Sequence, residues 1–102
     1  MQFDVFRNPI TRARRVMPFI TLLQSDAVRT EQDRVVAFIA EKALIASNGR
    51  LTPTVVVQER EYLLLIQSVT NLSAADLRRP IDNIAAHRDQ IVRGLDWLFL
   101  GV

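Results

Sequence analysis

The sequence predicts a mainly β protein with a C-terminal α-helix, in which the strands form an antiparallel sheet or small barrel. Two observations lead to this prediction. Short runs of β-branched and aromatic residues, separated by Pro, Asn-Gly and charged stretches, are typical of an antiparallel meander. From Pro80 to Gly101 the apolar residues instead recur at helical spacing.

The length limits how many domains these elements can form. A chain of 102 residues corresponds to about one domain, so we expect a single domain over residues 1–102. The hydrophobic fraction of 49% is high for so small a protein. A buried interface between subunits is the simplest outlet for this apolar surface.

Five strands are predicted before residue 70, at residues 3–5, 19–23, 34–39, 55–57 and 62–66. Asn48-Gly49 marks a turn, and the charged Glu59-Arg60-Glu61 marks a hairpin tip between the last two strands. The segment Ala40 to Ala46 can form a short helix. For Leu72 to Leu77 two structures are open, because Ser73 and Asp76 resemble a helix capping box while the segment is short enough for an edge strand.

The C-terminal helix is predicted to begin at Pro80 and to end at Gly101. Arg88 should pair with an acid or extend to the rim. Trp97 and Leu100 lie opposite the apolar stripe, so a second subunit or a partner should cover them, unless the helix unwinds before Leu100. The stripe that should face the sheet consists of Ile81, Ile84, Ile91, Val92, Leu95, Leu98, Phe99 and Val102.

The sequence offers little for catalysis. It contains no cysteine and one histidine, His87, which excludes thiolate zinc sites and cysteine nucleophiles. We interpret His87 as a surface or rim residue, and the evenly spaced Asp82, Asp89 and Asp96 as a solvated helix face. No metal and no cofactor are expected.

The charge pattern does not favour direct nucleic-acid binding. The net charge is only +2, and the one basic cluster, Arg12, Arg14 and Arg15, is interpreted as a solvated loop between two strands. No apolar run is long enough to cross a bilayer, and the start lacks the order of a signal peptide. We expect a cytoplasmic protein without a membrane partner.

With catalysis and direct nucleic-acid binding disfavoured, we expect the protein to bind a partner through its C-terminal end. Phe99, Leu100 and Val102 form an apolar group on a helix whose last carbonyls and terminal carboxylate carry negative charge. Such an end suits a partner that offers apolar surface and a cation. Gly101 would let the final residues leave the helix and approach this partner closely.

Four segments resemble the CcdB family, bacterial toxins that poison DNA gyrase. The start, Met1-Gln2-Phe3-Asp4-Val5-Phe6, and the end, Leu98-Phe99-Leu100-Gly101-Val102, both resemble the family's termini. Leu23-Gln24-Ser25-Asp26 and Leu51-Thr52-Pro53-Thr54-Val55-Val56 resemble two internal segments. The resemblance implies the CcdB/MazF-like barrel fold, a strand over Leu72 to Leu77, and a homodimer whose chain ends lie side by side.

The resemblance also implies a function. The protein would be the toxin of a type II toxin–antitoxin system, acting in plasmid maintenance, that binds the DNA gyrase A subunit without catalysis and traps the cleaved DNA complex. By position, Leu100, Gly101 and Val102 would contact gyrase. The residues implied to flank this tip are Asp96, Phe99, Ala27 and Val28.

The resemblance also implies a cognate CcdA-like antitoxin, which would bind a surface overlapping the gyrase site through a disordered tail. The toxin and the antitoxin would act together in transcription autoregulation. The toxin would contact DNA only through the antitoxin or gyrase. Two alternatives stay open. One is a MazF-like mRNA endoribonuclease that uses Arg14 or Arg15. The other is a non-poisoning homologue that only binds antitoxin, because the family's best-known toxins have tryptophan at the position of Leu100.

Overall fold

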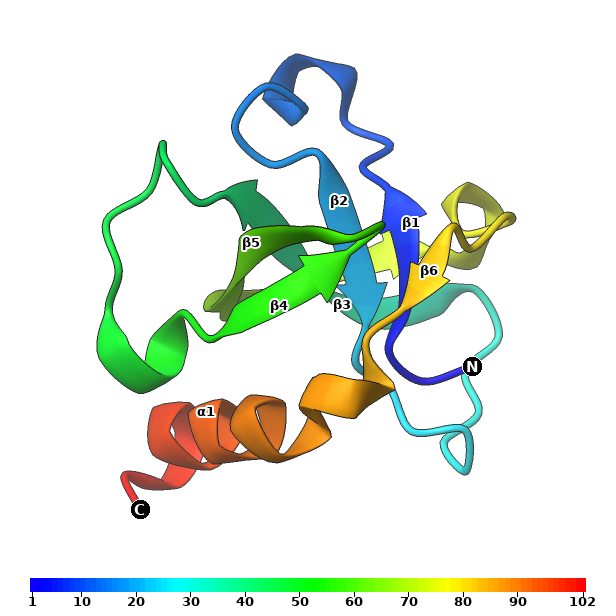
Figure 1. Ribbon diagram of the computed structural model, residues 1–102. Helices are drawn as coiled ribbons and strands as arrows, with labels where there is room; N and C mark the ends of the chain where they lie inside the picture. Colours follow the sequence, from blue (N-terminus) through cyan, green and yellow to red (C-terminus); the bar gives the residue numbers. More distant parts are fainter.

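The computed structural model describes residues 1–102 as a six-stranded antiparallel sheet and one α-helix (Figure 1). The sheet has the order β4-β5-β3-β2-β1-β6 and curls into a nearly closed barrel. The helix α1, Arg88–Leu100, lies across one end of it. The strands are β1 Asp4–Arg7, β2 Phe19–Leu22, β3 Asp33–Glu41, β4 Thr54–Val57, β5 Arg60–Ser73 and β6 Asp82–Asn83. The predicted fold class is confirmed.

One long strand allows the sheet to curl. β5 has 14 residues and pairs with β3 on both sides of a bulge, where the register shifts between Val36 and Phe38. Ser68 fills the gap, since its hydroxyl accepts from the Phe38 N–H at 2.9 Å and donates to the Leu65 carbonyl at 2.6 Å. A bulge of this kind bends a strand, so β5 can serve both halves of the barrel.

Two apolar clusters cover the two faces of the sheet. Along β3 the side chains alternate between them, because Val36 and Phe38 belong to the smaller cluster and Ala37 and Ile39 to the larger one. The larger cluster fills the barrel and receives Ile84 and Ile91 from the C-terminal part of the chain. Burial of this cluster is what fixes the position of α1.

The five predicted strands are confirmed, with differences at their ends. The largest difference is β5, which continues past Ile66 to Ser73 because β3 offers partners along this whole length. The hairpin between β4 and β5 is also confirmed, but its turn is Gln58-Glu59, with φ of 49° and 70°. Two-residue hairpin loops require such positive φ values. Asn48 and Gly49 lie at the start of a 3₁₀ turn, η2, Gly49–Leu51.

The expectation of a short helix over Ala40 to Ala46 is wrong. β3 continues to Glu41, and Ala40 is fully buried opposite Leu63 of β5. Pairing with β5 therefore overrides the helical propensity of this stretch. A turn follows at residues 42–44.

Each interpretation of Leu72 to Leu77 is correct for a part of the segment. Leu72 and Ser73 end β5, opposite Arg34 and Asp33 of β3. The chain then forms a 3₁₀ turn, η3, Ala74–Asp76, in which the Ser73 hydroxyl accepts from the Ala75 N–H. The implied strand thus ends four residues early, where the pairing with β3 stops.

The predicted helix start at Pro80 is wrong, since α1 begins at Arg88 after the 3₁₀ turn η4, Ala85–His87. The intervening residues pair with the N-terminal strand instead. The Ile81 N–H donates to the Val5 carbonyl at 2.8 Å, and the Ile84 N–H donates to the Phe3 carbonyl at 2.9 Å. With 13 residues, α1 is too short and too polar to cross a lipid bilayer.

Candidate functional site

Asn83 joins the segment before α1 to the start of the chain. Its side-chain Nδ2 donates to the Gln2 carbonyl at 3.1 Å and to the Asp4 Oδ1 at 3.0 Å. Its Oδ1 accepts from the Ala85 N–H at 2.8 Å, which begins the turn that leads into the helix. The side chain is half-buried. Asn83 therefore sets where α1 starts relative to the sheet.

Replacement of Asn83 with alanine should lower the free energy of unfolding by about 1–2 kcal/mol, because three hydrogen bonds are lost and their partners stay half-buried. Urea unfolding measures this change. Asn71→Ala is the matched control, since Asn71 is exposed and its side chain makes no hydrogen bond. Equal stability of the two variants would contradict the role of Asn83.

Gly94 allows α1 to approach the η2 turn very closely. A Cβ atom at this position would lie 2.6 Å from the Arg50 carbonyl oxygen and 2.9 Å from the Ile66 Cγ1. Both distances are too short for real contacts. Only glycine fits here, so Gly94 and the buried Ile91 set how the helix lies on β5 and η2.

The apolar stripe of the helix is only partly buried, which corrects the prediction. Ile84, Ile91 and Leu95 pack on the barrel cluster as predicted. The other members face solvent because the helix starts eight residues later than expected and its last turn has no covering element in the chain. These exposed members are Ile81, Val92, Leu98, Phe99 and Val102.

The last turn of α1 and the residues after it form an exposed apolar group, which we call the helix tip, consisting of Phe99, Leu100 and Val102. Their exposed fractions are 66%, 70% and 75%. Trp97 is 45% exposed. The prediction that the chain itself leaves Trp97 and Leu100 uncovered is therefore confirmed. Clustered exposed apolar side chains on a small protein indicate a binding surface.

Gly101 ends the helix in the left-handed conformation, with φ of 70°. Its N–H donates to the carbonyls of Asp96 and Trp97, at 3.1 Å and 3.2 Å. The predicted helix end is confirmed. Asp96 is exposed and forms no ion pair, so its carboxylate adds to the negative end of the helix dipole beside the helix tip.

Trp97 has a cationic neighbour within the chain. The Arg50 guanidinium carbon lies 4.9 Å from the centre of the indole ring, which is a cation-π contact. Neither this contact nor the close approach at Gly94 was predicted. A glycine in a helix interior is the only sequence signal for either of them, because it indicates close packing without naming the partner.

Ala27 and Val28 lie apart from the helix tip within one chain. They belong to the loop between β2 and β3, shown in cyan near the N-terminus, whereas the chain ends on the other side of the molecule (Figure 1). Both are exposed. The Val28 N–H donates to the Ser25 carbonyl at 3.0 Å, and the loop is tied to the N-terminus by a bond from the Gln2 N–H to Asp26.

The remaining candidates have structural surroundings. His87 is half-buried, and its Nε2 accepts from the Val56 N–H at 3.1 Å, which fits the predicted rim position. Arg88 extends to the rim as predicted, with its guanidinium carbon 5.9 Å from the Phe3 ring centre. Asp82 is not on the helix, which corrects that prediction. It lies in β6 and accepts from the Gln58 N–H at 2.7 Å.

The arginine cluster lies in the loop between β1 and β2, as predicted. Arg12 and Arg15 are exposed, and Arg14 is half-buried with its Nε donating to the Asn8 carbonyl at 2.6 Å. No carboxylate forms an ion pair with any of them. This arrangement fits a loop that Arg14 ties to the sheet.

A nearly closed antiparallel barrel with a C-terminal helix and an exposed apolar helix tip defines a small protein of the CcdB/MazF-like class. The model of the family described as CcdB protein matches residues 2–101, and the chain belongs to this family. Membership supports a toxin of a toxin–antitoxin system, which implies a cognate antitoxin as partner. A search of curated proteins gave no significant match.

Proposed function

We propose that this toxin binds the DNA gyrase A subunit through the helix tip and traps the enzyme on cleaved DNA. The observation that supports the proposal most is the exposure of Phe99, Leu100 and Val102 at the negative end of α1. An apolar group beside a negative helix end suits a partner that offers apolar surface and a cation. Gly101 gives the turn that directs Val102 away from the helix.

A homodimer completes this proposal. Val92 and Leu98 are each 36% exposed and extend the apolar surface along α1 beyond the helix tip, while Trp97 is exposed on the opposite side of the helix. A second copy that covers this part of the helix would place two helix tips side by side. It would also offer a second loop with Ala27 and Val28, which one chain keeps away from its own tip. We therefore propose that the flanking residues act from the dimer.

The proposal for the antitoxin follows from the same surface. A disordered antitoxin tail that orders over the helix tip would compete with gyrase and release it. We further propose that the protein acts in the cytoplasm by binding other proteins. It contacts DNA only through gyrase or the antitoxin. Autoregulation with the antitoxin and plasmid maintenance belong to it as well.

Calorimetric titration onto the dimerisation domain of gyrase A tests the proposal. The intact protein should bind saturably, and a variant that lacks Leu100, Gly101 and Val102 should not bind, because it loses most of the exposed apolar tip. Leu44→Ser is the matched control. Leu44 is 47% exposed but lies in the turn after β3, so this variant should bind like the parent.

Circular dichroism of each variant separates loss of the site from loss of the fold. No saturable binding by the folded parent at tens of micromolar would refute gyrase as the target. Undiminished binding by the truncated variant would refute the helix tip as the site. RNA cleavage by the parent would instead favour the ribonuclease alternative.

A further inference from the structure

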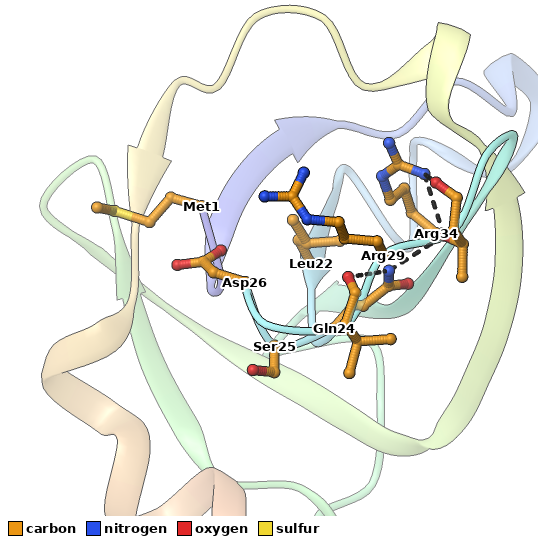
Figure 2. Close-up of a pocket in the computed structure, with 9 residues that line it drawn as sticks. Met1, Leu22, Gln24, Ser25, Asp26, Arg29 and Arg34 are labelled. Atoms are coloured by element: carbon orange, nitrogen blue, oxygen red, sulfur yellow. Dashed lines mark hydrogen bonds between the residues drawn. The ribbon is translucent and has the colours of Figure 1, made fainter.

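A second surface, away from the helix tip, combines unpaired arginines with an apolar floor. Figure 2 shows one end of it, where Arg29 extends across Leu22 and Arg34 lies beside the loop that follows β2. Leu22 and Arg34 also line the adjoining hollow, together with Phe6 and Leu77. The two hollows are therefore neighbours that share lining residues, and we call them, together with the hollow described next, the basic groove.

The other end of the basic groove is lined by three more arginines. Phe6 is shared with a third hollow, whose rim includes Arg7 of β1 and the consecutive Arg78 and Arg79 after η3. All three arginines are exposed. The groove thus runs from one pair of guanidinium groups, over apolar side chains, to a group of three.

These guanidinium groups have no acidic partner in the chain. The ion pairs of the protein join Lys42 to Glu61, Arg60 to Glu41, and the N-terminal amine to Asp4. None of the five groove arginines takes part. Unpaired positive charge gathered around one depression creates a potential that favours an acidic ligand.

The groove also runs past an open strand edge. β6 pairs with β1 only at Asp4 and Val5, while β2 pairs with β1 as far as Arg7. Arg7 therefore has no strand neighbour on the β6 side, whereas Phe6 directs its backbone groups to Ile20 of β2. An exposed strand edge can accept an extended peptide by backbone hydrogen bonds.

We propose that the basic groove binds an extended acidic segment of a partner protein. The segment pairs with the free backbone groups of Arg7, directs carboxylates to the arginines, and places apolar side chains over Leu22 and Leu77. One end of the groove includes Val28, a residue of the proposed gyrase contact. The end that holds Arg78 and Arg79 follows η3 and lies away from the helix tip, so the proposal is tested there independently of gyrase binding (Figure 1).

The groove suits a peptide better than a nucleic acid. Three carboxylates, those of Asp4, Asp26 and Asp76, also line it, so a ligand must direct its negative charge to the arginines at the two ends and not along the whole groove, as a phosphate backbone would. Its only aromatic side chain, Phe6, is 6% exposed, so it offers no platform on which bases can stack. An apolar floor between charged ends matches a segment that mixes acidic and apolar residues.

Fluorescence anisotropy with a labelled peptide of alternating glutamate and leucine, about eight residues long, tests the proposal on the full-length protein. Saturable binding is expected, with a dissociation constant below about 0.1 mM. The double variant Arg78→Glu/Arg79→Glu should weaken binding about tenfold, since attraction becomes repulsion at two exposed sites. Arg12→Glu/Arg15→Glu, also exposed but outside the groove, should bind like the parent.

Two further probes identify how the ligand is held. A peptide with N-methyl groups on alternate residues should bind at least about tenfold more weakly, because it cannot pair with the edge of β1. An oligothymidylate of equal length should bind more weakly than the acidic peptide. No saturable peptide binding to the folded parent, equal weakening in both arginine variants, or tighter binding of the oligothymidylate would each overturn the proposal. Gyrase binding by the groove variant is expected to be unchanged, so the two proposals fail independently.

Discussion

Replacement of Gly94 with valine should lower the free energy of unfolding by about 3 kcal/mol or more. The Cβ atom alone would lie 2.6 Å from the Arg50 carbonyl oxygen, and a backbone oxygen cannot move aside as a flexible side chain can. The two γ-methyl groups of valine add to this overlap with Ile66. Overpacking of a buried contact costs about 1–3 kcal/mol per site and occasionally more.

The matched control for this variant is Arg93→Val. Arg93 is the preceding residue and is exposed, so valine there costs only its helix propensity, about 0.5 kcal/mol. Gly94→Ala should lie between the two variants, because the gain in helix propensity offsets part of the clash. Guanidinium unfolding of the three proteins measures the series. A Gly94→Ala variant as stable as the parent would show that α1 does not need its close approach to η2.

The strands could be predicted because their signals are local. In β3 the residues Val36, Ala37, Phe38 and Ile39 are all apolar and all buried, since the strand has an apolar cluster on each face. A continuous apolar run is visible in the sequence without knowledge of its partners. The same holds for Gly101, whose place after the last apolar residue of α1 predicted the helix end.

The wrong predictions concern residues whose structure depends on distant partners. Asp82 and Asn83 read as the first turn of a helix, but they pair with β1, about 80 residues earlier in the chain. The charged Glu59-Arg60-Glu61 predicted the hairpin, but the turn itself is Gln58-Glu59, whose positive φ values occur without glycine or asparagine to indicate the position. Ala40 has a high helix propensity but is held in β3 by pairing with Leu63 of β5.

One part of the candidate site could be predicted because its signal is local, as it is for the strands. The helix tip follows from the apolar residues near Gly101, which are adjacent in sequence. The stacking of Arg50 on Trp97 joins a turn to a helix nearly half the chain away, and no residue pattern indicates it. The basic groove likewise brings together arginines from four separate segments. Such sites become visible only in the folded chain.

Replacement of Leu100 with tryptophan should tighten binding to the gyrase A dimerisation domain about thirtyfold to several hundredfold. Leu100 is 70% exposed, so the larger ring fits without strain in the free protein. An indole face can stack on a cation of the partner, which leucine cannot do, and this contact gives about 1–2 kcal/mol per site. In a dimer both subunits contribute, so the effect is doubled on the free-energy scale.

Leu44→Trp is the control, because it adds the same ring at another exposed leucine, one that lies outside the helix tip. Calorimetry should show that this variant binds the gyrase A dimerisation domain with the same affinity as the parent protein. If both tryptophan variants gain affinity equally, the gain is unspecific and the tip is not where gyrase binds. If neither gains, the partner offers no cation beside Leu100. Apolar contact alone would then account for the binding, and the negative end of α1 would not be what selects the partner.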